Sequence, residues 1–125
     1  MIWLSIASGG AVGAMLRFYL SSSLSRFELQ GFPWGIFSVN ILGCALMGML
    51  YVGLDRLEIS DDLRYFLTVG LLGAFTTFST FSLQLYELLI AGRVGLALMY
   101  GGGSLAGCLA ALALGVWLAQ TLWGH

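Results

Sequence analysis

The sequence contains no lysine, a single proline and a single histidine, and only 9% of its 125 residues are charged. Soluble domains average about 25% charged residues. A soluble domain of this length would expose a large share of its surface to water, and so few charges would not cover it. Hydrophobic residues make up 59% of the chain, against roughly 45–50% in soluble domains. The composition therefore predicts an integral membrane protein.

The residues that carry enzyme chemistry are also missing. His125 is the last residue, and the two cysteines, Cys44 and Cys108, fall in apolar segments, where thiols usually act as small buried side chains. There is no Ser-His-Asp set, no group of residues with metal-ligand spacing and no phosphate-binding loop. We therefore expect that the protein is not an enzyme and has no nucleic-acid partner.

Charged residues divide the chain into four apolar segments, each at or near the ~20 residues that a helix needs to cross ~30 Å of hydrocarbon. These segments are residues 2–20, 34–54, 63–90 and 94–122. The short connections between them place sequential helices side by side and antiparallel. The prediction is an all-α membrane protein with four transmembrane helices in a single domain, residues 1–125. The first segment lacks the positive start of a signal peptide, so we expect it to be retained.

The five arginines are shared almost equally between the two sides of the predicted bundle. Arg56 and Arg64 flank the second connection, on the side of both termini, whereas Arg26 and Arg93 lie in the other two connections and Arg17 is near that end of the first span. Orientation normally follows an excess of positive charge on the cytoplasmic side. The nearly equal numbers of arginines on the two sides favour insertion of the chain in both orientations. They also favour an antiparallel homodimer, the two-chain form of an inverted repeat. The alternative is that other signals fix one orientation.

Glycines at four-residue spacing predict close helix packing, because they let two backbones approach each other in lipid. Gly9 and Gly13 form one such pair in the first span. The fourth span carries a longer stripe of small residues: Gly103, Gly107, Ala111 and Gly115. We interpret both stripes as packing features without a chemical role.

The third span is longer than one crossing needs, and its middle holds five hydroxyl residues within positions 76–82. Threonine and the preceding glycines weaken a helix there. Irregular backbone at membrane depth survives only where protein buries it or where it lines a watery cavity. The segment is therefore either an ion site or a kink whose hydroxyls bond back to the helix, and the clustering favours the ion site.

Two phenylalanines, Phe78 and Phe81, lie three residues apart among these hydroxyls, which include Ser79 and Thr80. A phenyl ring has a positive edge, so it can touch an anion without offering a counter-charge. Weak contacts of this kind suit conduction, because a tightly held ion would not leave.

Other polar residues in the spans have two interpretations each. The Asn40 amide can donate to an anion or bridge two helices. Arg17 can reach the headgroups or make a vestibule positive. Tyr100, Ser104 and Cys108 are four residues apart, which places them on one face of the fourth span.

The sequence resembles the Fluc (CrcB) family of small dimeric fluoride channels over its whole length. The most specific motif is Gly73-x-x-Thr76-Thr77-Phe78-Ser79-Thr80-Phe81 in the third span. Two weaker motifs precede it in the expected order, Gly9-Gly10-x-x-Gly13-Ala14-x-x-Arg17-Phe18 and Gly35-x-x-x-Val39-Asn40-x-x-Gly43.

The resemblance implies an antiparallel homodimer in a bacterial inner membrane, with two fluoride pores lined by both subunits. Such channels export fluoride passively and protect the cell from it. The implied fluoride path comprises Asn40, Phe78, Ser79, Thr80, Phe81, Tyr100 and Ser104. Arg17 would belong to a positive vestibule. A structural sodium ion on the two-fold axis would be held by main-chain carbonyls of Gly73 and Thr76.

The chain departs from the family pattern at four positions. Ile36 stands after Gly35 where a threonine is frequent, Ala74 replaces a glycine, Gln84 replaces a glutamate and Cys108 replaces a hydroxyl. Ile36 and Cys108 each remove a possible donor from the anion path, whereas none of the four removes a named pore residue.

Two other functions have weaker support. A small dual-topology multidrug exporter needs a glutamate in its first span, but the first acid here is Glu28, in a connection. A structural subunit, or one that works only with a paralogue, would use the hydroxyl cluster only to hold helices together. Such a subunit would tolerate replacement of Phe78 and Phe81.

Overall fold

The computed structural model describes residues 1–27 and 31–124, and every regular element in them is helical. The first helix is α1 (Ile2–Leu24), which is followed by the 3-10 turn η1 (Ser25–Phe27). The second and last helices are α2 (Trp34–Arg56) and α6 (Val94–Trp123). Between them, the third span consists of α3 (Asp61–Tyr65), the π-helix η2 (Phe66–Leu72), α4 (Gly73–Phe75) and α5 (Ser79–Ile90).

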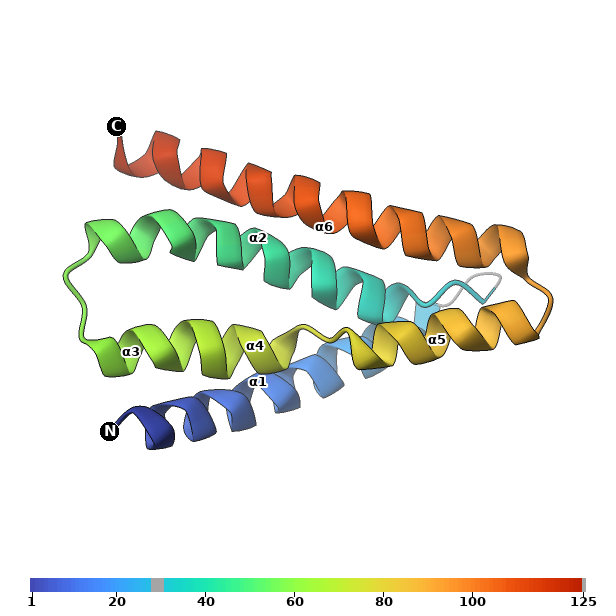
Figure 1. Ribbon diagram of the computed structural model, residues 1–125, viewed down its shortest axis with the longest axis horizontal. Helices are drawn as coiled ribbons and strands as arrows, with labels where there is room; N and C mark the ends of the chain where they lie inside the picture. Colours follow the sequence, from blue (N-terminus) through green and yellow to red (C-terminus); the bar gives the residue numbers. More distant parts are fainter. Residues whose placement is uncertain (28–30, 125) are drawn as a thin grey trace.

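The four spans run back and forth along one long axis (Figure 1). Both termini and the connection from α2 to α3 lie at one end of the molecule, and the turn from α5 to α6 lies at the other. Gly92 makes this turn possible, because its φ of 77° falls in the left-handed region. The predicted antiparallel order of sequential helices is confirmed, and it makes α2 and α6 run parallel to each other.

Three helical segments are long and apolar enough to cross a membrane, namely Trp34–Arg56, Asp61–Ile90 and Val94–Trp123. The fourth expected span, α1, has 23 residues, which corresponds to roughly 34 Å at helical rise. It is not among the three, because serines, glycines and Arg17 dilute its apolar character. Its crossing of the membrane remains a prediction.

The helices meet backbone to backbone at the predicted glycines. A Cβ at Gly9 would overlap the carbonyl oxygen of Phe66, and one at Gly13 would overlap that of Leu71, so α1 lies directly on η2. On the other side, α2 contacts α6 in the same way through Gly48 and Gly115. The packing role of the Gly9–Gly13 pair and of Gly115 is confirmed.

Few side chains are buried within one chain. The inner clusters are small, and the larger of them gathers around Tyr100 with Phe32, Leu88 and Ala97. Many large apolar side chains point outward along the whole length of the bundle, as Trp3, Leu105 and Leu122 do. Together with the three apolar spans, this exposure of apolar side chains defines a multi-pass membrane protein.

Candidate functional site

The third span breaks where the hydroxyl cluster lies. The helix ends at Phe75, Thr76 is extended with φ −82° and ψ 155°, and helix resumes at Ser79. The predicted break is therefore confirmed. Thr76 Oγ1 donates back to the Leu72 carbonyl at 3.0 Å, and Thr77 Oγ1 accepts from the Thr80 N–H at 3.2 Å. The hydroxyls thus end one helix and begin the next, as short polar side chains do.

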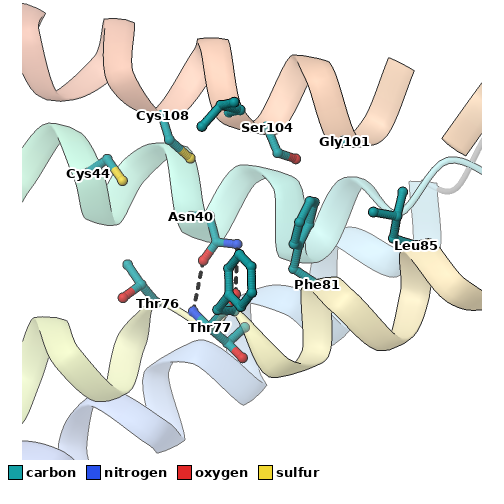
Figure 2. A pocket seen from close by; sticks show the side chains of 11 residues that line it. Asn40, Cys44, Thr76, Thr77, Phe81, Leu85, Gly101, Ser104 and Cys108 are labelled. Carbon is teal, nitrogen blue, oxygen red and sulfur yellow. Dashed lines mark hydrogen bonds between the residues drawn. The ribbon is translucent and has the colours of Figure 1, made fainter. Parts of the chain in front are cut away.

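Asn40, on the neighbouring helix α2, forms two hydrogen bonds with the main chain at the break. Its Nδ2 donates to the Thr77 carbonyl at 3.1 Å, and its Oδ1 accepts from the Thr77 N–H at 2.9 Å (Figure 2). Both residues are buried, so one side chain satisfies both main-chain groups of Thr77 at a position with little exposure to solvent. Of the two roles considered for Asn40, the structure shows the bridge between helices, and one of its two Nδ2 hydrogens is left for another acceptor.

At the break, two main-chain donors do not reach the acceptors that they would have in a continuous helix. In a continuous α-helix the Thr77 N–H would reach the Gly73 carbonyl, and the Thr80 N–H would reach the Thr76 carbonyl. Here the first donates to Asn40 and the second to the Thr77 hydroxyl. The Gly73 and Thr76 carbonyls are consequently available to other partners. Within residues 1–27 and 31–124 no three His, Cys, Asp or Glu side chains gather into a possible metal site.

The two phenylalanines lie together, but they face different surroundings. The ring centroids of Phe78 and Phe81 are 5.8 Å apart. Phe81 turns inward and meets the Tyr100 ring at 4.9 Å, whereas Phe78 is 79% exposed. The pair thus reaches from the interior of the chain to its outer surface.

Tyr100, Ser104 and Cys108 follow one face of α6 toward this pair. Tyr100 is fully buried, and its hydroxyl donates to Gln84 Oε1 at 2.7 Å. The Ser104 hydroxyl is also buried, and no group of the described chain bonds to it. A buried hydroxyl without a partner is costly, and it marks a place where a ligand or water would be stabilised. The shared face of these residues is confirmed.

A cavity of about 450 Å³ lies between α2, the break with α5, and α6 (Figure 2). No charged side chain lines it. Its polar and aromatic lining consists of Asn40, Cys44, Thr76, Thr77, Phe78, Phe81, Ser104 and Cys108. The cavity thus combines an amide, hydroxyls, thiols and aromatic rings without a fixed charge.

Several expected site residues are not in the lining. Tyr100 lies behind Phe81, and Thr80 is half-buried next to the break. Ser79 and Gly73 are exposed on the surface of the chain, and the half-buried Arg17 forms no ion pair within the described residues. The residues expected from the sequence thus include some that line this cavity and others that do not.

Three residues at the site received no role from the sequence. Thr77 is the main-chain partner of Asn40, Gln84 is the acceptor for Tyr100, and Cys44 lines the cavity. A signal was present for Cys44, because it follows Asn40 by four residues and therefore shares its helix face. Gln84 could be paired with Tyr100 only once the packing of α5 against α6 was known.

Fold and site together define a polytopic helical membrane protein with a largely apolar, uncharged cavity, lined by a few polar side chains, at an interrupted span. The chain belongs to the CrcB family, since residues 4–116 match the family described as "CrcB-like protein, Camphor Resistance (CrcB)". This confirms the resemblance drawn from the sequence motifs.

Curated relatives cover nearly the whole chain. A "Fluoride-specific ion channel FluC" of Phocaeicola vulgatus is 43% identical over 94% of this chain and 97% of its own length. "Fluoride-specific ion channel FluC 1" of Moorella thermoacetica is 43% identical, covering 96% of this chain and 86% of its own. A relative of the same name from Stutzerimonas stutzeri is 44% identical over 93% of this chain and 94% of its own.

Proposed function

We propose that this chain forms a fluoride-selective passive channel, which exports fluoride across the inner membrane and confers resistance to it. The names of its relatives support this function. The observation in this chain that carries it is the uncharged cavity at the break. Fluoride is small and strongly hydrated, so a path has to replace its water with donors and ring edges while binding it weakly at several points. No catalytic step is involved.

In this proposal the fluoride path follows the cavity and its rim. Ser104 is the best-supported contact, because its buried hydroxyl has no partner within the described chain. The remaining Nδ2 hydrogen of Asn40 and the edges of the two phenylalanine rings supply further contacts. The full set of path residues is Asn40, Phe78, Ser79, Thr80, Phe81, Tyr100 and Ser104, with Arg17 making the vestibule positive.

We further propose that the working unit is an antiparallel homodimer with two pores. The near-equal arginine distribution favours insertion in both orientations. The exposure of Phe78, at 79%, supports a second chain beside it, because a path residue facing lipid could not conduct an ion. A partner chain would close the open side of each cavity.

A structural sodium ion is the last part of the proposal. Unwound carbonyls in broken membrane helices are typical sodium ligands, and the carbonyls of Gly73 and Thr76 have lost their helical donors. These residues fit the ion, which would be shared with the same residues of the second chain on the two-fold axis. Bound there, sodium would supply a fixed positive charge between two anion paths.

The test is anion release from liposomes that contain the purified protein. Vesicles loaded with potassium fluoride or potassium chloride are triggered with valinomycin. We expect release of fluoride without release of chloride. Failure to release either anion from folded dimers would refute the channel and would favour a structural or paralogue-dependent subunit.

Phe78→Ile tests the path itself. We expect fluoride release to slow about threefold to tenfold, since one aromatic contact is worth about 0.5–1.5 kcal/mol. Tyr86→Ile is the matched control, because Tyr86 is also on this span and is 60% exposed but lies outside the cavity lining. Equal rates for both variants would remove Phe78 from the path.

A further inference from the structure

The two cysteines of the chain come together at the cavity. Cys44 is on α2 and Cys108 is on α6, and both are free thiols that line it. Figure 2 shows the Cys108 sulfur directed toward α2, the helix that carries Cys44. No other cysteine exists in the sequence.

The helix register explains why these thiols face each other. Helices α2 and α6 run parallel, and a Cβ at Gly48 would overlap the carbonyl oxygen of Leu112. Cys44 precedes Gly48 by four residues, and Cys108 precedes Leu112 by four. The two cysteines therefore lie opposite each other, one helical turn earlier along each helix. The backbones therefore touch one turn away from the thiols, which keeps the pair at short range.

We propose that Cys44 and Cys108 form a two-sulfur site for the soft cation Hg²⁺, and that the bound cation blocks the cavity. Thiolates select soft cations, and two opposed sulfurs suit the linear coordination that these ions accept. When Hg²⁺ binds, each sulfur forms one bond to the metal and each thiol releases its proton to water. The complex carries no net charge, which matters because charge is expensive inside a membrane.

The position of the pair explains the expected blockade. Cys44 follows Asn40 by one turn, and Cys108 follows Ser104 by one turn. A cation between the sulfurs would therefore lie at the end of the cavity next to the amide and the unpartnered hydroxyl. It would occupy space that an anion needs and would make the lining rigid.

The binding test uses the full chain in detergent, with Hg²⁺ as the probe. We expect one Hg²⁺ per chain to protect both thiols from a maleimide reagent and to release two protons. Cys44→Ser and Cys108→Ser each leave a single thiol, and an added monothiol should strip Hg²⁺ from either variant about 10²–10⁴ times more easily, the usual gain from joining two sites.

Three results would overturn the site. These are two Hg²⁺ per chain bound independently, a single Hg²⁺ that bridges two chains, and single variants that hold the metal as firmly as the parent chain. Cys44→Ala and Cys108→Ala repeat the comparison if a serine variant fails to fold, and the doubly substituted chain gives the background.

The transport test rests on the proposed function, whereas the binding test does not. We expect Hg²⁺ to stop fluoride release from liposomes, a dithiol to restore it, and Cys108→Ser to resist the block at the same dose. Stoichiometric binding without any block would support the metal site and would count against this cavity as the fluoride path. The two proposals can therefore fail separately.

Discussion

The pairing of Asn40 with Thr77 allows a sharp prediction for Asn40→Leu. Leucine has the same branching at Cγ as asparagine and the same number of side-chain heavy atoms, so the substitution leaves no empty space. It removes both hydrogen bonds, at 3.1 and 2.9 Å, and leaves the main-chain N–H and carbonyl of Thr77 without partners. Thr77 is only 8% exposed, so water from the cavity would replace the lost amide only in part.

The size of the effect follows from the environment. An unsatisfied buried polar group costs about 1–3 kcal/mol in soluble proteins, but measured interhelical hydrogen bonds in a membrane average about 0.6 kcal/mol and reach about 1.7. Two such bonds give about 1–3 kcal/mol of lost stability. A chain of this length loses about 3–5 °C of melting temperature per kcal/mol, so we expect the midpoint to fall by roughly 3–15 °C.

The assay is thermal unfolding in detergent, followed by loss of the helical circular dichroism signal. Gln120→Leu is the control, because it removes an amide from an exposed position of α6. Identical melting of Asn40→Leu and the parent chain would refute the structural role assigned to the pairing.

Two further predictions concern helix packing and the tyrosine hydroxyl. Gly115→Ala should destabilise the chain by about 1–3 kcal/mol in the same melting assay, because the added methyl group would overlap a backbone carbonyl of α2. The control is Gly102→Ala, whose methyl group would meet nothing within 4 Å. This variant should be neutral or mildly stabilising. Tyr100→Phe removes the 2.7 Å bond to Gln84 and should cost about 0.5–1.5 kcal/mol; Tyr86→Phe, at an exposed position, should melt like the parent chain.

The order of helices and the break could be derived from the sequence, because both depend on local composition. Apolar segments separated by charges set the spans, and the hydroxyl residues clustered within positions 76–82 predict an interruption, which the structure places at residues 76–78. The first span is the exception. Its serines and Arg17 bring α1 near the limit at which length and composition alone predict a crossing.

Contacts between distant segments could not be derived in the same way. Asn40 and Thr77 are 37 residues apart, and nothing in their local sequence specifies that one amide meets both main-chain groups of the other residue. The pairing of Cys44 with Cys108 likewise depends on the register of α2 against α6, which glycine contacts decide. Spacing along one helix predicts which of its residues share a face. It does not predict which residues of another helix contact that face.

The role of Asn40 in the fold also bears on how loss of function should be interpreted. By accepting the Thr77 N–H, this residue frees the Gly73 carbonyl, so it both stabilises the break and prepares a proposed cation ligand. A change at Asn40 would therefore disturb folding, the cation site and the anion path together, and lost transport would not separate them. Phe78 is the better probe of conduction, because a side chain that is 79% exposed contributes little to the stability of its own chain. A fall in fluoride release in Phe78→Ile, with thermal unfolding of the chain unchanged, would locate the effect in the path itself.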